Sequence, residues 1–176
     1  TLRAMGLDIV VVRSSSSGAP LQLARQLDVP VLNAGDGWHQ HPTQALLDLY
    51  TIRKELQSRD RGVDDLRIAL VGDLKYGRAV HSLCKLLAVF DNVHYKLVAP
   101  PGLGLPGDTI EGLRQRGHQV SEYGQLEPGI DHVDIVYVTR TQEERFPNQQ
   151  EADRYRERHQ QYQALYPALA PTFHSL

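Results

Sequence analysis

Short, unbroken runs of apolar residues alternate along this chain with segments in which apolar residues recur every three or four positions. The first run, residues 9–12, is a continuous aliphatic stretch, typical of a strand that is covered on both faces. Helical spacing follows Pro42, with apolar residues at Leu46, Leu49, Ile52 and Leu56. This alternation predicts an α/β fold with a doubly wound parallel sheet. The other predicted strands are 29–32, 67–71, 95–99, 119–123 and 135–138, and the other predicted helices are 21–27, 78–90, 108–116 and 149–163.

The pattern is interrupted once, by a charged, glycine-containing connection at residues 58–65. We therefore predict two domains joined by a helix. Residues 1–41 belong to a first α/β domain, residues 42–57 form the inter-domain helix, and residues 62–176 form the second, doubly wound domain.

Composition excludes several classes of protein. The single cysteine, Cys84, cannot form an internal disulfide, and the aliphatic run at 9–12 is far too short to span a bilayer. The net charge of -2, with both signs spread along the chain, argues against nucleic-acid binding. We expect a cytoplasmic globular protein that binds neither nucleic acid nor membrane.

Three arginines directly follow predicted strands or open the helix after one. Ligands of open parallel sheets bind beyond the carboxyl ends of the strands, where Arg13, Arg78 and Arg140 should lie. A guanidinium group matches the geometry of a carboxylate or a phosphate, so the three together predict a ligand with several anionic groups. For each arginine taken alone, an exposed or salt-bridged role is the alternative. Gln142 follows Arg140 closely enough to share its anion.

His41 precedes Pro42, and proline suits the first position of a helix. The helix start adds free N–H groups and the positive end of the helix dipole. His41 can donate a hydrogen bond to a carbonyl oxygen of a ligand, and the alternative roles are a helix N-cap or a buried structural histidine.

Two other kinds of site were weighed. The turn at 72–77 follows a strand as a dinucleotide loop does, but Leu74 stands where the middle glycine of that motif belongs, and no Gly-Lys-Ser or Gly-Lys-Thr is present. Asp36, His39 and His41 are conceivable metal ligands, although a glycine turn before a helix explains their spacing equally well. We expect no metal and no cofactor, and a nicotinamide-dependent dehydrogenase remains a lesser alternative.

Three segments, at 33–49, 72–83 and 137–146, closely resemble the catalytic chain of aspartate carbamoyltransferases. The resemblance extends from Met5 to about Tyr162. Ornithine carbamoyltransferases carry a cysteine where this chain has Thr43, and they lack the Leu-Lys-Tyr-Gly-Arg string that ends at Arg78. The resemblance therefore favours aspartate as the acceptor.

The resemblance implies a role for each matching residue. Residues 1–41 would be the remnant of a carbamoyl-phosphate domain, and residues 62–176 an aspartate-binding domain, incomplete at its C-terminal end. Carbamoyl phosphate would contact Arg13, His41 and Gln44, with His41 and Arg13 stabilising the developing oxyanion. Aspartate would be held by Arg78, Arg140 and Gln142, while Lys75 and Tyr76 support the loop without being catalytic.

The implied reaction is carbamoyl transfer from carbamoyl phosphate to the amino group of L-aspartate, in de novo pyrimidine biosynthesis. The family also implies a homotrimer that shares its sites between subunits, with regulatory subunits as further candidate partners. The family's Ser-Thr-Arg-Thr loop and His-Pro-Leu-Pro-Arg segment are absent, so we expect an internal portion of a longer chain. The alternative is a catalytically silent homologue or fragment that binds an anionic amino acid or a partner subunit.

Overall fold

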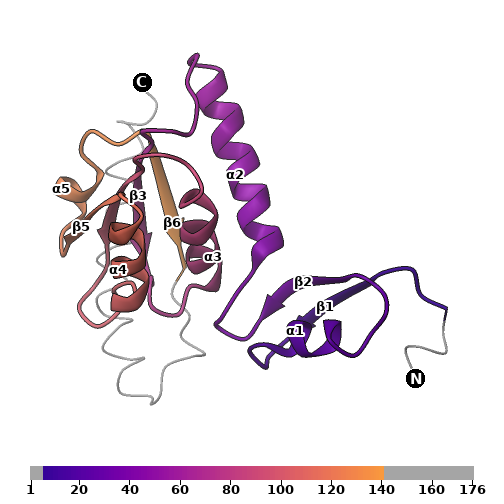
Figure 1. The fold of residues 1–176 in the computed structure, drawn as a ribbon. Helices are drawn as coiled ribbons and strands as arrows, with labels where there is room; N and C mark the ends of the chain where they lie inside the picture. Colours follow the sequence, from indigo (N-terminus) through magenta and orange to yellow (C-terminus); the bar gives the residue numbers. More distant parts are fainter. Residues whose placement is uncertain (1–5, 141–176) are drawn as a thin grey trace. The chain divides into compact units, whose positions relative to one another are not determined.

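The computed structural model describes residues 6–140, which form two parallel sheets with their connecting helices (Figure 1). The predicted helix at 149–163 and Gln142 lie outside the described residues. In chain order the elements are β1 (Val10–Ser14), α1 (Ala19–Ala24), β2 (Val31–Asp36), α2 (Pro42–Gln57), β3 (Arg67–Gly72), α3 (Arg78–Leu87), β4 (His94–Val98), α4 (Gly107–Gln115), β5 (Gln119–Tyr123), α5 (Leu126–Ile130) and β6 (Ile135–Thr139).

The second sheet has the strand order β5-β4-β3-β6, and all three pairings are parallel. The chain moves outward from β3 to β5 and then returns to the far side of β3, so the direction of winding reverses between β3 and β6. A reversal of this kind is the topological switch point at which open α/β sheets bind ligands. The doubly wound parallel sheet is confirmed, and its four strands lie within one residue of their predicted bounds.

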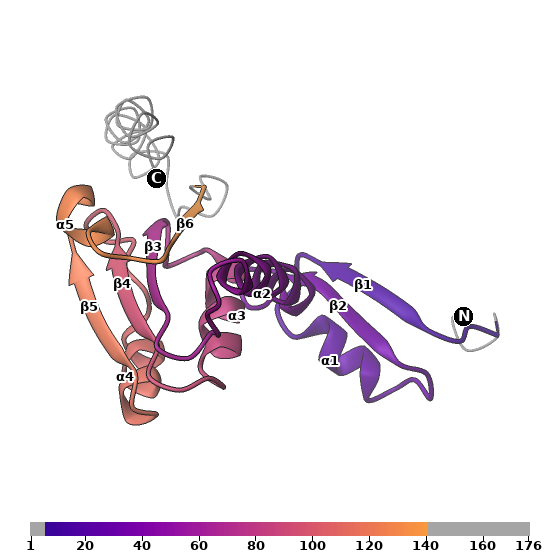
Figure 2. The same cartoon turned by 90° about the horizontal axis from the view of Figure 1, so that it is seen from above.

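One face of this sheet carries the hydrophobic core. Ile68 pairs with Tyr95 and with Ile135, so these side chains share a face. Helices α2, α3 and α4 supply the buried partners Ile52, Leu56, Val80, Leu83, Leu87, Ile110 and Leu113. Helix α2 lies beside α3 (Figure 2). It spans 42–57 as predicted, but Leu46 is 58% exposed and is not part of its buried stripe.

The opposite face is covered by the short helix α5, which the sequence analysis did not predict. A Cβ atom on Gly129 would overlap the side chain of Val98, so only glycine allows this close approach. Pro128 and Gly129 both interrupt helical patterns, which is why the sequence reads as a loop there.

The first sheet consists of β1 and β2, with α1 packed against both strands. The prediction that residues 9–12 are covered on both faces is wrong for this structure. Val11 and its partner Leu32 are 64% and 44% exposed, because α1 covers only one face of the two-stranded sheet. Among the described residues, no helix combines the length and apolar character needed to cross a membrane.

A carboxylate at the start of β6 ties together the beginnings of β3 and β6. Asp134 accepts hydrogen bonds from the guanidinium groups of Arg61 and Arg67 and from the backbone N–H of Arg67 at 2.9 Å. Burial alone would raise the pKa of Asp134, but the hydrogen bonds from Arg67 and Arg61 lower it from 3.8 to about 2. The ionised carboxylate is therefore the form that the fold stabilises.

We expect Asp134→Asn to lower the free energy of unfolding at pH 7 by about 1–2 kcal/mol, a value reduced for the partial exposure of both arginines. Because the folded-state pKa is depressed, the stabilisation is complete above about pH 4 and is lost as the pH falls towards 2. Urea titrations at pH 7 and pH 2.5 should show the gap between the two proteins closing in acid. Asp131→Asn, at an exposed carboxylate, is the control, and an equal gap at both pH values would contradict the assignment.

Candidate functional site

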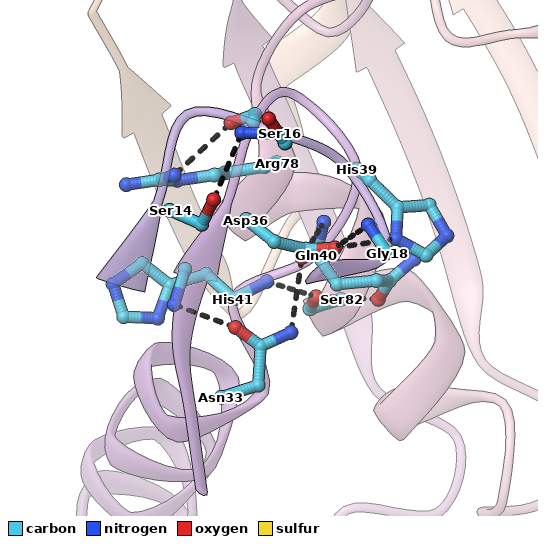
Figure 3. A network of polar contacts seen from close by, with 12 residues as sticks. Ser14, Ser16, Gly18, Asn33, Asp36, His39, Gln40, His41, Arg78 and Ser82 are labelled. Atoms are coloured by element: carbon cyan, nitrogen blue, oxygen red, sulfur yellow. Dashed lines mark hydrogen bonds and ion pairs between the residues drawn. The ribbon is translucent and has the colours of Figure 1, made fainter. Parts of the chain in front are cut away.

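The loop between β2 and α2 is built around the buried carboxylate of Asp36 (Figure 3). It accepts hydrogen bonds from the backbone N–H groups of Gly18 (2.6 Å) and Gln40 (3.1 Å) and from Asn33 Nδ2 (2.9 Å), and His39 Nδ1 lies 3.0 Å away. Burial would raise the pKa of Asp36, but the hydrogen bonds from Asn33, Gly18 and His39 hold it below its ordinary value. The ionised carboxylate therefore fixes the loop that presents His41.

This network also accounts for the acidic and histidine residues that were weighed as metal ligands. Asp36 and His39 contact each other, whereas the His41 ring turns to the start of its own helix. In the part of the chain that the structure describes, no three His, Cys, Asp or Glu side chains are grouped in a way that would hold a metal ion.

His41 is the N-cap of α2, and its backbone is anchored to α3 (Figure 3). Its N–H donates to Ser82 Oγ at 2.8 Å, and that hydroxyl donates to Gln40 Oε1 at 2.7 Å. Ser82 lies one helical turn after Arg78, so the loop that carries His41 is joined to the helix that carries Arg78.

The hydrogen bonds of the His41 ring determine which nitrogen carries its proton. Nδ1 accepts from the backbone N–H of Gln44 at 3.3 Å, with Thr43 Oγ1 at 3.2 Å. A neutral ring with Nδ1 as acceptor carries its proton on Nε2. Burial, followed by the charges of Arg78 and Arg13, holds the pKa of His41 below 6.5, so at pH 7 the ring is neutral and Nε2 is a donor. His41 thus combines the N-cap role, which was the alternative expectation, with an Nε2–H that can donate a hydrogen bond.

Arg78 opens α3 and reaches back to the loop after β2. Its Nη1 donates to the carbonyl oxygen of Gly37 at 3.0 Å. The guanidinium lies against the backbone of Gly35, where a Cβ atom would come within 2.7 Å of Arg78 Cζ. Gly35 has φ +112°, a backbone conformation that favours glycine, and its lack of a side chain leaves room for the Arg78 guanidinium.

A carboxylate on α2 orients the predicted ligand Gln44. Gln44 Nε2 donates to Asp48 Oδ1 at 2.9 Å, and the Tyr137 hydroxyl of β6 donates to Asp48 Oδ2 at 3.0 Å. Burial and then the Asp48 charge raise the pKa of Tyr137, so its hydroxyl remains a donor. Neither Asp48 nor Tyr137 was predicted from the sequence as part of the site. The available signal for Asp48 was its i, i+4 spacing from Gln44 on one helix face.

The other predicted arginines lie at strand ends. Arg13 is exposed near the end of β1, and its charge depresses the pKa of His41. Arg140 is exposed and follows Thr139, the residue that pairs with Gly72. The structure thus groups His41, Arg78 and Arg13, and it places Arg140 at the end of the strand next to β3.

The turn at 72–77 uses its own N–H groups internally. The N–H groups of Leu74 and Lys75 donate to Leu103 O at 2.9 and 3.1 Å, and that of Tyr76 donates to Asp73 Oδ1 at 2.9 Å. A dinucleotide loop must offer such N–H groups to phosphate, so this geometry disfavours the nicotinamide alternative. Tyr76 packs edge-on to Trp38, with ring centroids 6.4 Å apart, so this contact joins the turn to the loop after β2.

Comparison with known protein families agrees with this arrangement. A family model described as the carbamoyl-P binding domain of aspartate/ornithine carbamoyltransferase matches residues 1–54, and a model described as the Asp/Orn binding domain matches residues 64–167. Together they match well over half of the chain. The chain belongs to the aspartate/ornithine carbamoyltransferase family. The domain bounds predicted at 1–41, 42–57 and 62–176 stay predictions.

Curated relatives of this carbamoyltransferase-family chain are named aspartate carbamoyltransferase catalytic subunits. The Cellvibrio japonicus subunit is 55% identical over 159 residues, which are 90% of this chain and 47% of the relative. The Saccharophagus degradans subunit is 50% identical over the same shares. The chain therefore spans about half the length of the curated relatives it matches.

Solved structures of aspartate transcarbamoylases share the fold. The catalytic subunit from M. jannaschii superposes with a TM-score of 0.74 at 45% identity, covering 87% of this chain and 49% of that one. The Trypanosoma cruzi enzyme in complex with carbamoyl aspartate and phosphate gives a TM-score of 0.73 at 38% identity, covering 84% and 50%.

Proposed function

We propose that this carbamoyltransferase-family chain transfers the carbamoyl group of carbamoyl phosphate to the amino group of L-aspartate, giving N-carbamoyl-L-aspartate and phosphate in de novo pyrimidine biosynthesis. The observation that carries the proposal is a neutral imidazole, fixed with its donor on Nε2 and lying within range of the positive charges of Arg78 and Arg13. Cationic side chains are suited to bind a phosphate and two carboxylates, and a neutral hydrogen-bond donor is suited to bind the carbonyl oxygen of the carbamoyl group.

The chemistry needs no nucleophilic side chain. The uncharged amine of aspartate attacks the carbamoyl carbon, and negative charge develops on the carbonyl oxygen. The new C–N bond forms as the C–O bond to phosphate breaks, and the departing phosphate can take the proton that the amine gives up. His41 Nε2–H and Arg13 stabilise the oxyanion, and the remaining acceleration comes from holding two charged substrates together.

The proposed binding role of each site residue follows from the charge of its side chain and of the substrate group. Arg13, His41 and Gln44 hold carbamoyl phosphate, and Arg78, Arg140 and Gln142 hold aspartate. Arginines at both Arg78 and Arg140 suit an acceptor with an acidic side chain, whereas they would repel the ammonium group of ornithine. The relatives are named aspartate carbamoyltransferases, which supports the same acceptor.

We expect Arg78→Lys to raise the KM for aspartate at least about tenfold while the KM for carbamoyl phosphate changes little. Lysine keeps the charge but loses the planar fork that lies against Gly35 and donates to Gly37 O. Steady-state kinetics with each substrate varied in turn measures the effect. Arg114→Lys, at an exposed position on α4, is the control, and an unchanged aspartate KM in Arg78→Lys would remove the assignment.

The direct test is formation of carbamoyl aspartate by this chain and by a chimaera. In the chimaera, the segments of the Cellvibrio japonicus relative that flank the matched region are joined to it. Activity that disappears with His41→Ala supports the proposal, and an inactive, folded chimaera contradicts it.

A second candidate follows from the length that this chain shares with its relatives. A chain that matches 47% of such a subunit can bind an anionic amino acid or a partner subunit without transferring a carbamoyl group. Aspartate binding by calorimetry, with no product from the chain or from the chimaera, would favour this candidate.

The proposal extends to assembly and location. We propose a cytoplasmic homotrimer with sites shared between neighbouring subunits. Regulatory subunits are further candidate partners of this trimer. Support comes from the family membership and from the family resemblance of the site motifs. Light scattering that gives a monomer mass for the active protein would contradict the trimer.

A further inference from the structure

The carboxylate of Asp48 lies between two hydrogen-bond donors from different elements. Gln44, one turn earlier on α2, donates from Nε2 at 2.9 Å, and Tyr137 of β6 donates from its hydroxyl at 3.0 Å. Each donor uses a different oxygen of the carboxylate, and both contacts are partly buried. Asp48 is therefore held at both oxygens and cannot turn freely.

This arrangement decides which end of the Gln44 amide faces a ligand. An ionised carboxylate can only accept hydrogen bonds, so it pairs with Nε2 and repels Oε1. The Tyr137 hydroxyl keeps the carboxylate in place. With Nε2 held by Asp48, Oε1 is the end of the amide left to accept a hydrogen bond from a substrate.

The carbamoyl group differs from other transferable acyl groups in carrying an amine, which is a donor. We propose that Asp48 is a positioning and specificity-determining residue. It fixes the Gln44 amide so that Oε1 accepts from the carbamoyl amine, which selects carbamoyl phosphate over acyl phosphates with a methyl group at that position. The inference rests on the proposed function, because it assumes that Gln44 contacts the carbamoyl group.

Tyr137 connects the Asp48–Gln44 pair to the part of the site where aspartate is proposed to bind. It lies three residues before Arg140, on the strand that leads to that arginine. Its hydroxyl is the contact through which β6 holds Asp48, so Tyr137 supports the orientation of Gln44 from the strand that precedes Arg140.

The test compares carbamoyl phosphate with acetyl phosphate, in which a methyl group replaces the amine. In both reactions the aspartate amine forms a bond to the acyl carbon as the carbon–oxygen bond to phosphate breaks. The discrimination ratio is kcat/KM for carbamoyl phosphate divided by kcat/KM for acetyl phosphate. Asp48→Asn keeps the size of the side chain, but its amide can pair with either orientation of Gln44.

We expect Asp48→Asn, made in the active chimaera, to lower the discrimination ratio at least about fivefold, the value of one ordinary hydrogen bond. Tyr137→Phe removes only the hydroxyl that donates to Asp48 and should lower the discrimination ratio about twofold to threefold. Glu55→Gln removes the same charge from an exposed position on α2 and should leave the ratio unchanged. In a Gln44→Leu background, Asp48→Asn should produce no further change in the ratio.

A general structural role for Asp48 would reduce both activities in equal proportion. An unchanged ratio in Asp48→Asn, or a further change in the Gln44→Leu background, overturns the inference while leaving the proposed function intact. If Asp48→Asn does not fold, Tyr137→Phe decides, and an unchanged ratio there overturns the inference. If the unsubstituted chimaera makes no carbamoyl aspartate, the proposed function fails as well.

Discussion

Replacement of His41 by alanine is expected to lower kcat for carbamoyl-aspartate formation about 10²–10³-fold, the usual cost of removing one oxyanion donor. The structure gives the reason, because Nδ1 accepts from Gln44 N–H and the donor is therefore on Nε2. The hydrogen bond strengthens as charge develops on the carbonyl oxygen, so kcat should fall much more than the affinity for aspartate. Initial rates at saturating concentrations of both substrates measure this effect.

The N-cap role of His41 calls for a separate control. Alanine removes the cap as well as the donor, and the loss of a cap costs about 1 kcal/mol of stability. Asparagine is a good N-cap residue but lacks an Nε2 donor, so His41→Asn should retain most of the thermal stability and still lose turnover. If His41→Asn keeps the unsubstituted kcat, His41 is a structural residue only.

A substitution at Gly72 should have the largest effect on stability. We expect Gly72→Ala to lower the free energy of unfolding by about 3 kcal/mol or more. Gly72 ends β3 with φ +116°, a conformation that other residues rarely adopt, and an added Cβ would overlap the carbonyl oxygen of Thr139. The overlap is with backbone, so relief requires β3 and β6 to separate at the switch point. Equilibrium unfolding in urea, followed by circular dichroism, measures the loss.

Gly112 offers a matched control for the same chemical change. It lies within α4, with no atom within 4 Å of an added Cβ, so Gly112→Ala should be neutral or should stabilise the protein by about 0.5–1 kcal/mol. Similar stabilities for Gly72→Ala and Gly112→Ala would show that β3 and β6 are not packed as described.

Most elements were predictable because their patterns are local. Helix α2 was predicted from Pro42 and its apolar spacing, and β5 has the predicted bounds, since turn residues flank it on both sides. Helix α5 was not predictable in this way, because Pro128 and Gly129 both interrupt helical patterns and the close packing of Gly129 on Val98 is a tertiary contact. Val11 was misjudged because an aliphatic run does not reveal how many layers cover its sheet.

The site residues also divide into those that local sequence predicts and those that only tertiary contacts bring together. Arg13, His41, Arg78 and Arg140 could be chosen from the sequence, because each lies near the end of a strand or the start of a helix and carries a group suited to an anion or a carbonyl oxygen. Asp48 and Tyr137 could not be chosen, because 89 residues separate them and a tertiary hydrogen bond joins them.

The sequence by itself determined the order of the strands and of the helices other than α5, and the types of side chain available at the strand ends, because both depend on residues close together in the chain. The tertiary structure alone decided that His41 donates from Nε2, that Arg78 lies against Gly35, and that the Gln44 amide donates to Asp48. Each of these depends on a contact between groups in fixed positions, and a hydrogen bond acquires its direction only when the fold places the donor against the acceptor.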